Sequence, residues 1–277
     1  MLQTAGPRND TPGTGLLHVA WNGARSVPIQ AYAVSPLRLL TPRNAGTAAW
    51  VYTSTYGGGL VDGDRMSLHV HVAPGASAWV STQSSTKVYR SPHGTTSDVR
   101  ATVDAGGLLA FVPDPVTCFE GATYRQTTEI DVAMGASLVL VDTLTAGRRA
   151  SGERWKFDNF DGRLTVRHNG RLIVYDGLSL RAADGDLIDR FGRFNAVAMV
   201  LVIGSPLASH AASIVTQAAA LPMLPRPSLL QAASALDGGG CMLRLAGVSV
   251  EDVGNAVRSA LRFLPTILGD DPWGRKW

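Results

Sequence analysis

The chain has 277 residues, of which 45% are hydrophobic and only 17% are charged, and its formal net charge is +3. The 25 lysines and arginines form no run, which disfavours nucleic-acid binding, and the longest apolar run, residues 196–203, is too short to cross a bilayer. Two distant cysteines fit a reducing compartment better than a disulfide framework. We therefore expect a cytoplasmic protein that binds neither nucleic acid nor membranes.

The N-terminal residues 1–14 are rich in threonine, proline and glycine and contain no apolar segment. We expect a flexible N-terminus without a signal peptide, followed by a single domain over residues 15–277. This domain is predicted to be β-rich over residues 15–204 and to contain helices over residues 205–277. From Leu16 to about Asp142 the dominant hydrophobic period is two, which is the period of a β-strand.

Three similar segments recur within this part of the chain. Each consists of a strand, a glycine-containing turn and a second strand, and the turns contain Gly75, Gly106 and Gly135. These glycines are 31 and 29 residues apart. A repeat of about thirty residues is typical of stacked supersecondary units. Since there are only three copies, we predict a layered or helically wound β-structure and not a long solenoid.

The remaining elements follow in chain order. Residues 163–175 form a predicted hairpin around Asn169-Gly170, and residues 196–203 read as a buried strand. Helical spacing then predicts one helix over residues 208–221 and another over 249–268, the second kinked or shortened by Pro265. The predicted fold class is therefore mainly β, with two α-helices in the C-terminal third.

A glycine-rich loop, residues 57–64, reads Gly-Gly-Gly-Leu-Val-Asp-Gly-Asp and directly precedes a strand. Glycine at this density marks positive φ or a close approach of the backbone. A phosphate-binding loop requires Gly-Lys-Ser/Thr and a following helix, so nucleotide binding is not favoured. We interpret the loop as a tight turn, which leaves Asp62 and Asp64 unexplained.

Two further groups of residues suggest chemistry without establishing it. His69 and His71 project from the same face of a strand, but no third metal ligand is evident nearby, so we expect a solvent-facing pair. Asp114 stands between two prolines, six residues before Glu120. These carboxylates serve either a β-rich carbohydrate-binding or carbohydrate-active module or simple turns.

No catalytic signature accompanies these groups. The sequence contains no nucleophile elbow, no zinc-ligand spacing and no recognisable Ser-His-Asp pattern. Cys118 has no histidine partner in the sequence, which predicts a buried, inert thiol. We therefore expect that the protein is not an enzyme.

Four blocks of sequence resemble the UreD (also called UreH) family of urease accessory proteins. They are residues 56–64, residues 82–91, residues 112–115 with 119–122, and residues 147–153. The resemblance covers about residues 15–180, and the C-terminal third is similar in style. Two features depart from the family: Cys118 stands where a proline or aliphatic residue is expected, and the tail reads Pro272-Trp-Gly-Arg-Lys-Trp277.

The resemblance implies a layered β-fold and a non-enzymatic role in nickel insertion. Such a scaffold docks with UreF and the GTPase UreG on the urease apoprotein, and UreE is the implied nickel donor. GTP hydrolysis by the GTPase then accompanies insertion of nickel into the urease metallocentre. No tightly bound cofactor is implied, and nickel is expected to bind only transiently.

The resemblance also implies an internal passage for nickel. A divalent ion crossing a protein needs oxygen or nitrogen ligands that are weak enough to release it. The four blocks supply such groups, with Lys87 as a supporting charge: Asp64, Thr82, Gln83, Asp114, Glu120 and Glu153. We predict that Asp64, Glu120 and Glu153 line the passage. The alternative is that they cap turns and pair with Lys87 or Arg90.

Overall fold

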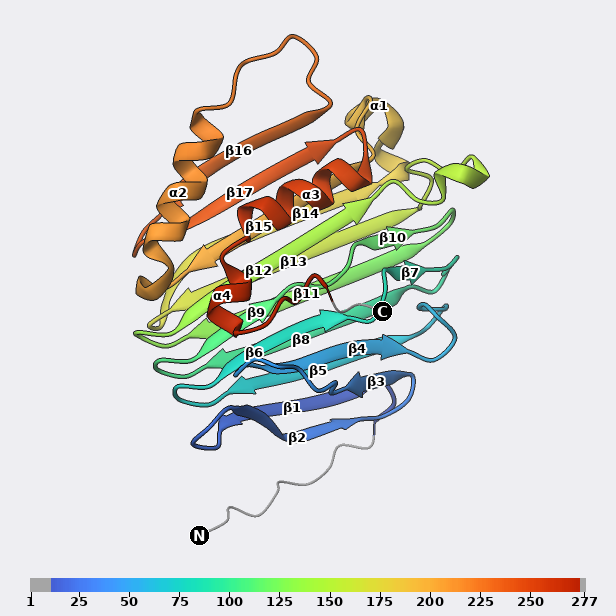
Figure 1. Cartoon of the computed structure of the whole chain (residues 1–277). Coiled ribbons are helices and arrows are strands. Elements are labelled where there is room, and N and C mark those ends of the chain that lie inside the picture. The colour runs from blue at the N-terminus through green and yellow to red at the C-terminus, as the bar shows by residue number, and fades with distance from the viewer. Residues whose placement is uncertain (1–10, 275–277) are drawn as a thin grey trace.

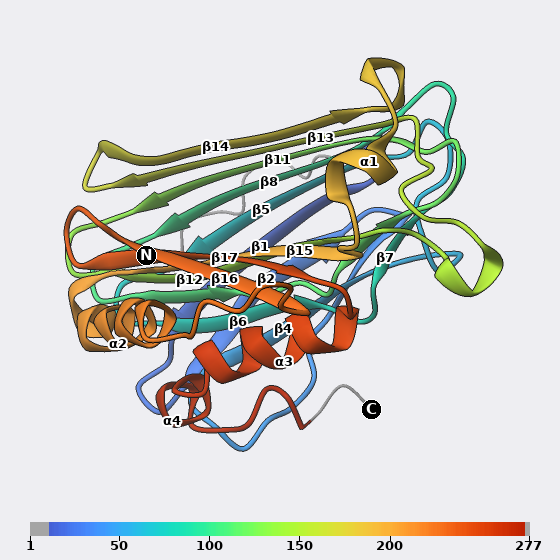
Figure 2. The same ribbon diagram turned by 90° about the horizontal axis from the view of Figure 1, so that it is seen from above.

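The computed structural model describes residues 11–274, in which two β-sheets pack face to face and helices cover one of them (Figures 1 and 2). The predicted flexible N-terminus falls mostly on residues 1–10, which lie outside the described residues, as do the last three residues of the tail. Within the described part, β-strands dominate and the long helices come late, which confirms the predicted fold class.

The seven-stranded sheet has the order β14 (Arg171–Arg181), β13 (Asn159–His168), β11 (Thr123–Val132), β8 (Thr95–Val103), β5 (Arg65–Val72), β1 (Thr14–Trp21) and β2 (Ser26–Ala33). The ten-stranded sheet has the order β16 (Leu229–Leu236), β17 (Gly240–Gly247), β15 (Ala196–Ile203), β12 (Ser137–Thr145), β9 (Leu108–Phe111), β6 (Ser77–Thr82), β4 (Ala49–Thr55) and β3 (Leu37–Leu40). Two short strands complete the second sheet: β10 (Val116–Cys118) pairs with β12, and β7 (Thr86–Val88) pairs with β10.

The chain winds helically between the two sheets, as the repeat predicts. β5, β8 and β11 lie parallel in one sheet, and β6, β9 and β12 lie parallel in the other. In the register, Leu68 lies beside Val99 and Val99 lies beside Thr128. The spacings of 31 and 29 residues are therefore the lengths of successive turns of the winding. Their turn glycines all have positive φ, between 70° and 75°, a region in which a residue with a Cβ is strained.

Helices cover the outer face of the ten-stranded sheet (Figure 2). They are α2 (Ala208–Ala219), α3 (Val250–Ala260) and α4 (Leu264–Leu268), and a core containing Trp50, Trp79 and Val200 is buried beneath them. The helix predicted over residues 249–268 is split into α3 and α4. Ser249 caps α3 by accepting hydrogen bonds from the backbone N–H groups of Glu251 and Asp252. Pro265 stands in the first turn of α4, where a missing N–H costs no helical hydrogen bond.

Short helical segments that the sequence did not predict occupy connections. They are α1 (Leu187–Phe191) and three 3₁₀ turns at Arg149–Ser151, Ala182–Asp184 and Ser205–Leu207. Near the C-terminus, Trp273 packs edge-on against Trp79 with ring centroids 5.3 Å apart, so this part of the tail lies on the ten-stranded sheet. No helix among residues 11–274 is long and apolar enough to cross a membrane.

Candidate functional site

The space between the two sheets is apolar at one end and polar at the other. Along β11, the side chains that face the opposite sheet are Tyr124, Gln126 and Thr128, and then Ile130 and Val132. β12 changes in the same way, from Leu138 and Leu140 in the apolar core to Asp142, and β4 changes from Val51 to Thr53 and Thr55. The apolar end lies beside the glycine turns of the winding.

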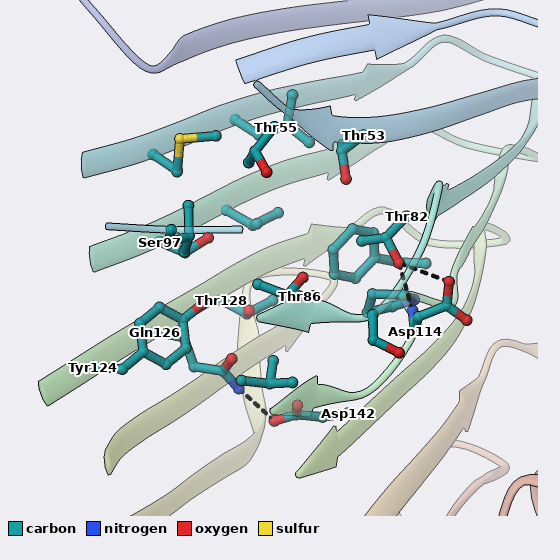
Figure 3. A pocket seen from close by; sticks show the side chains of 18 of the residues that line it. Thr53, Thr55, Thr82, Thr86, Ser97, Asp114, Tyr124, Gln126, Thr128 and Asp142 are labelled. Carbon is teal, nitrogen blue, oxygen red and sulfur yellow. Dashed lines mark hydrogen bonds between the residues drawn. The ribbon is translucent and has the colours of Figure 1, made fainter. Parts of the chain in front are cut away.

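The polar end encloses a cavity of about 150 Å³, enough for several water molecules. Figure 3 shows its side chains converging from both sheets. Oxygen atoms dominate the polar lining. The carboxylates come from Asp98, Asp114 and Asp142, and Arg163 is the one cationic residue among the described residues of the lining. The hydroxyl groups come from Thr53, Ser54, Thr55, Thr82, Ser84, Ser85, Thr86, Ser97, Tyr124 and Thr128.

Asp142 is the acidic group that faces Gln126 across the cavity (Figure 3). Gln126 Nε2 donates a hydrogen bond of 2.8 Å to Asp142 Oδ2. Burial raises the pKa of Asp142, and the nearby charge of Asp176 raises it further. Burial also raises the pKa of the Tyr124 hydroxyl. The local environment thus disfavours a bare negative charge at Asp142.

The glycine-rich loop forms one edge of this cavity. Gly57 and Gly58 have positive φ of 85° and 73°, whereas Gly59 is confined by its neighbours. A Cβ at Gly59 would lie 2.7 Å from both the carbonyl oxygen of Lys87 and the ring of Tyr89. The loop is therefore a close backbone crossing, which agrees with the interpretation as a tight turn. Gly58 and Ser84 are the exposed lining residues on this side, so the cavity meets the surface between their loops.

Some of the residues predicted for the passage meet at the cavity. Thr82 Oγ1 donates to Asp114 Oδ2 at 3.2 Å and accepts from the Asp114 backbone N–H at 2.7 Å (Figure 3). Gln83 is exposed and hydrogen-bonds Ser54 Oγ at 2.7 Å. Lys87 is exposed, and neither Gln83 nor Lys87 belongs to the cavity lining.

The two aspartates of the glycine-rich loop stabilise turns. Asp64 Oδ2 accepts a hydrogen bond of 2.8 Å from the backbone N–H of Val61. Asp62 accepts from the backbone N–H of His93 at 2.8 Å and contacts His93 Nδ1 at 2.7 Å, and the side-chain contact lowers the pKa of Asp62. Asp64 is not part of the cavity lining, so its geometry matches the capping alternative.

Glu120 and Glu153 lie together in a separate cluster. Glu153 is 6% exposed and accepts from Arg148 Nε at 3.0 Å and from the backbone N–H of Glu120 at 3.3 Å. The hydrogen bond from Arg148 lowers the pKa of Glu153. Arg148 also lies over the ring of Phe119, 4.3 Å from its centroid. Arg148 is therefore the cationic partner of Glu153, in place of the expected Lys87 or Arg90, and a role for either glutamate in metal transfer stays a prediction.

Sequence reasoning missed several residues that line the cavity, above all Asp142, Gln126 and Ser97. A signal was present, because Asp142 directly follows the apolar run of residues 138–141 and alternates with Leu140 on the inward face. The pattern identifies a polar residue on a core-facing position. It cannot identify the residue on the opposite sheet that will face it.

The histidines lie on the outer face of the seven-stranded sheet, as expected. His71 Nε2 contacts Asp104 Oδ2 at 2.8 Å, and the ring of His18 stacks on that of His71 at 4.4 Å. Burial, followed by the nearby His71, lowers the pKa of His18. Among the described residues, no group of three or more His, Cys, Asp and Glu side chains is arranged to hold a metal ion. Cys118 and Cys241 are both buried, and burial raises the pKa of Cys241 to about 11.

Comparison with known proteins gives one consistent result. The family model for the UreD urease accessory protein matches residues 12–277. A urease accessory protein UreD from Sorangium cellulosum is 48% identical over 96% of this chain and 84% of its own length. The corresponding protein of Anaeromyxobacter sp. is 40% identical over 95% and 89%, and urease accessory protein D of Oryza sativa subsp. indica is 32% identical over 94% and 95%. The chain therefore belongs to the UreD family of urease accessory proteins.

Proposed function

We propose that this chain is a non-enzymatic scaffold in cytoplasmic urease maturation and that the cavity between its sheets is part of the route by which nickel reaches the metallocentre. Membership of the urease accessory family gives the role in urease maturation. The proposed partners are UreF and the GTPase UreG, which dock with it on the urease apoprotein, and UreE as nickel donor. The observation that carries the proposal is a cavity in which hydroxyl, amide and carboxylate groups from both sheets meet among apolar side chains, inside a sandwich whose other half is wholly apolar.

The chemistry of the lining suits transit better than storage. Hydroxyl, amide and carboxylate oxygens bind a transition-metal ion less tightly than imidazole or thiolate groups do. An ion that must pass through needs binding favourable enough for entry and weak enough for exit. The cavity supplies oxygen donors from several strands and no histidine or cysteine among its described lining residues. Its volume leaves room for water to complete the coordination shell.

Asp142 has a specific role in this proposal. Burial raises its pKa, because an uncompensated carboxylate charge is poorly solvated there. A divalent cation in the cavity supplies the opposite charge that stabilises this carboxylate. The amide of Gln126, already in contact with Asp142, offers an additional oxygen donor. Thr82 and Asp114 form the corresponding polar pair nearer the exposed loops.

The test is activation of urease by the intact assembly. The chain is co-expressed with UreF, UreG, UreE and apo-urease, and nickel content, urease activity and complex assembly are measured together. Asp142→Asn removes the carboxylate and keeps the shape, so we expect lower nickel incorporation with unchanged assembly. Asp131→Asn is the matched control, since Asp131 is an exposed residue of β11 on the outer face.

Two outcomes would contradict the proposal. Normal nickel incorporation with Asp142→Asn excludes that carboxylate from the route, and loss of assembly assigns it a structural role. The same assay applied to Asp64→Ala, Glu120→Ala and Glu153→Ala decides whether these residues act in transfer. Because Asp64 caps a turn and Glu153 pairs with Arg148, we expect their substitutions to reduce assembly before they affect nickel content.

A further inference from the structure

The cavity extends across the sandwich, away from the place between Gly58 and Ser84 where it meets the surface. Its last lining residues in that direction are Leu164 of β13 and Met199 of β15, both buried. β6, which precedes Ser84, and β15 are three strand spacings apart in the ten-stranded sheet, about 14 Å in all. The far end of the cavity therefore lies toward β14 and β17, the next strand outward on each sheet.

An ion pair occupies the next inward position on each of these two strands. Asp176 of β14 lies beside Leu164 in the register, and Arg244 of β17 lies beside Met199. Arg244 Nη2 donates a hydrogen bond of 2.6 Å to Asp176 Oδ1, which joins the two sheets. Figure 2 is viewed from this side of the sandwich. The Arg244 side chain is 58% exposed and that of Asp176 is 24% exposed, so the pair stands between the cavity and solvent.

Packing of the two strands does not account for this pair. The neighbouring inward positions on β14 and β17 are all apolar: Val174, Leu178, Met242 and Ala246. A second ion pair, between Arg171 and Asp237 at 3.2 Å, already links β14 to the turn that joins β16 and β17. Solvent-exposed ion pairs contribute little to stability. The charges of Asp176 and Arg244 at the end of a cavity therefore suggest a role in the traffic of ions.

We propose that Asp176 is a cation-binding residue at a second opening of the cavity and that Arg244 occupies its carboxylate until a divalent cation takes its place. The inference rests on the proposed route for nickel and gives that route a second opening to the surface. Arg244 has a long side chain that can move into solvent, and separating an exposed ion pair costs little. The arriving cation then compensates the carboxylate in place of the guanidinium group.

Asp142 is placed to exchange an ion with Asp176. Asp142 lies beside Met199 in the register, and Met199 lies beside Arg244, the partner of Asp176. Asp142 and Arg244 are therefore two strand spacings apart, about 10 Å between their backbones. Passage of an ion through a protein uses several weak sites in succession. Asp142 inside the cavity and Asp176 at its end form such a succession.

The first test measures access to the cavity and does not involve nickel. Met199→Cys places a thiol at the last lining position before the ion pair, and the two natural cysteines are buried and give a low background. In the purified full chain, Arg244→Ala should raise the rate at which a cationic methanethiosulfonate reagent modifies this thiol by about fivefold. Arg171→Ala breaks the other ion pair between the same parts of the chain. It is the matched control and should leave the rate unchanged.

The charge of the reagent tests Asp176 itself. Without Arg244, the carboxylate of Asp176 should favour the cationic reagent over a neutral reagent of similar size. Arg244→Ala/Asp176→Asn should lower this preference and keep the faster access. The reaction is carried out under conditions in which urea unfolding shows every variant to be folded. An unchanged rate in Arg244→Ala, or a preference that does not fall in the double variant, overturns the proposal.

The second test connects this opening with nickel. In the co-expressed assembly, Asp176→Asn should lower the nickel content of urease with unchanged assembly, whereas the control Asp237→Asn should leave the nickel content unchanged. Normal nickel content in Asp176→Asn, when Asp142→Asn lowers it, overturns this inference and leaves the proposed function standing. Loss of assembly in Asp176→Asn also overturns it. If Asp142→Asn has no effect, the proposed function fails, and the labelling rates still decide whether the ion pair closes an opening.

Discussion

The two halves of the space between the sheets share one backbone and differ in chemistry. On β11, Ile130 and Val132 fill one half with apolar side chains, whereas Gln126 and Thr128 face the other half. Strand pairing continues unbroken through both halves, since β11 stays in register with β8 and β13 along its length. Strand pairing therefore does not require apolar side chains in the polar half. The apolar half and the core beneath the helices stabilise the sandwich, and the remaining space is free for function.

One position beside the polar half is restricted to glycine by packing. Gly162 lies beside Gln126 in the register between β11 and β13, at an inward position where Leu164 and Val166 follow on the same strand. A Cβ at Gly162 would come within 2.9 Å of the ring of Phe160. Tight packing of the aromatic ring therefore excludes a side chain at this point.

The largest expected effect is a difference in stability between substitutions in the apolar and the polar half of β11. Ile130→Ala removes a side chain that is 2% exposed and should lower the free energy of unfolding by about 2–5 kcal/mol. Thr128→Ala, two residues earlier on the same face, should lower the free energy of unfolding by about 1 kcal/mol or less. The Thr128 side chain borders an existing cavity, so its removal creates little new empty space. Urea denaturation of both variants gives the comparison. Equal losses would show that the polar half contributes to stability as the apolar half does.

A smaller effect on stability is expected when one member of the Gln126–Asp142 pair is replaced, compared with replacement of both. Gln126→Leu leaves Asp142 without its 2.8 Å donor and should cost about 1–3 kcal/mol of unfolding free energy. In Gln126→Leu/Asp142→Leu both polar groups are gone, so stability should return to within about 1 kcal/mol of the wild type. Urease activation by the double variant should nevertheless stay low. Recovery of both stability and activation would argue against a functional reason for the polar half.

The smallest effect is a pH dependence with opposite signs at two carboxyl groups. Burial raises the pKa of Asp142, so its contribution to stability is present below the ordinary aspartate range and is lost as pH rises through the raised value. Arg148 lowers the pKa of Glu153, so that contribution is present above the ordinary glutamate range and is lost as pH falls through the lowered value. Urea unfolding as a function of pH measures both.

Two substitutions isolate these contributions. Asp142→Asn should remove the loss of stability at rising pH, and Glu153→Gln should remove the loss at falling pH. The second variant thus controls for general effects of pH on the chain. The same sign of change in both variants would contradict the environments assigned to the two groups.

Much of the architecture follows from local patterns. The strand period, the thirty-residue repeat and its turn glycines predict the winding, because each turn of the chain carries the same strand and turn signals. Ser249, with the acids that follow it, predicts the start of α3 in the same local way. The site was harder to predict: Thr82 and Asp114 line the cavity, whereas Asp64 caps a turn and Glu153 pairs with Arg148. A role of Asp64, Glu120 or Glu153 in nickel transfer stays a prediction.

The sequence by itself determined the β-class, the repeating winding, the two C-terminal helices and the resemblance to UreD proteins, since each depends on residue order within a short window. Only the tertiary structure decided that Asp142 faces Gln126 and that Arg148 faces Glu153. It also decided that the backbone of Gly59 passes close to Lys87 and that β16 lies at the edge of the ten-stranded sheet. These features depend on how the two sheets pack together and on which strands lie at the sheet edges. Alternation along one strand predicts which face of the sheet a side chain occupies. The residue that it contacts on the opposite sheet belongs to another turn of the winding, so the local pattern cannot identify it.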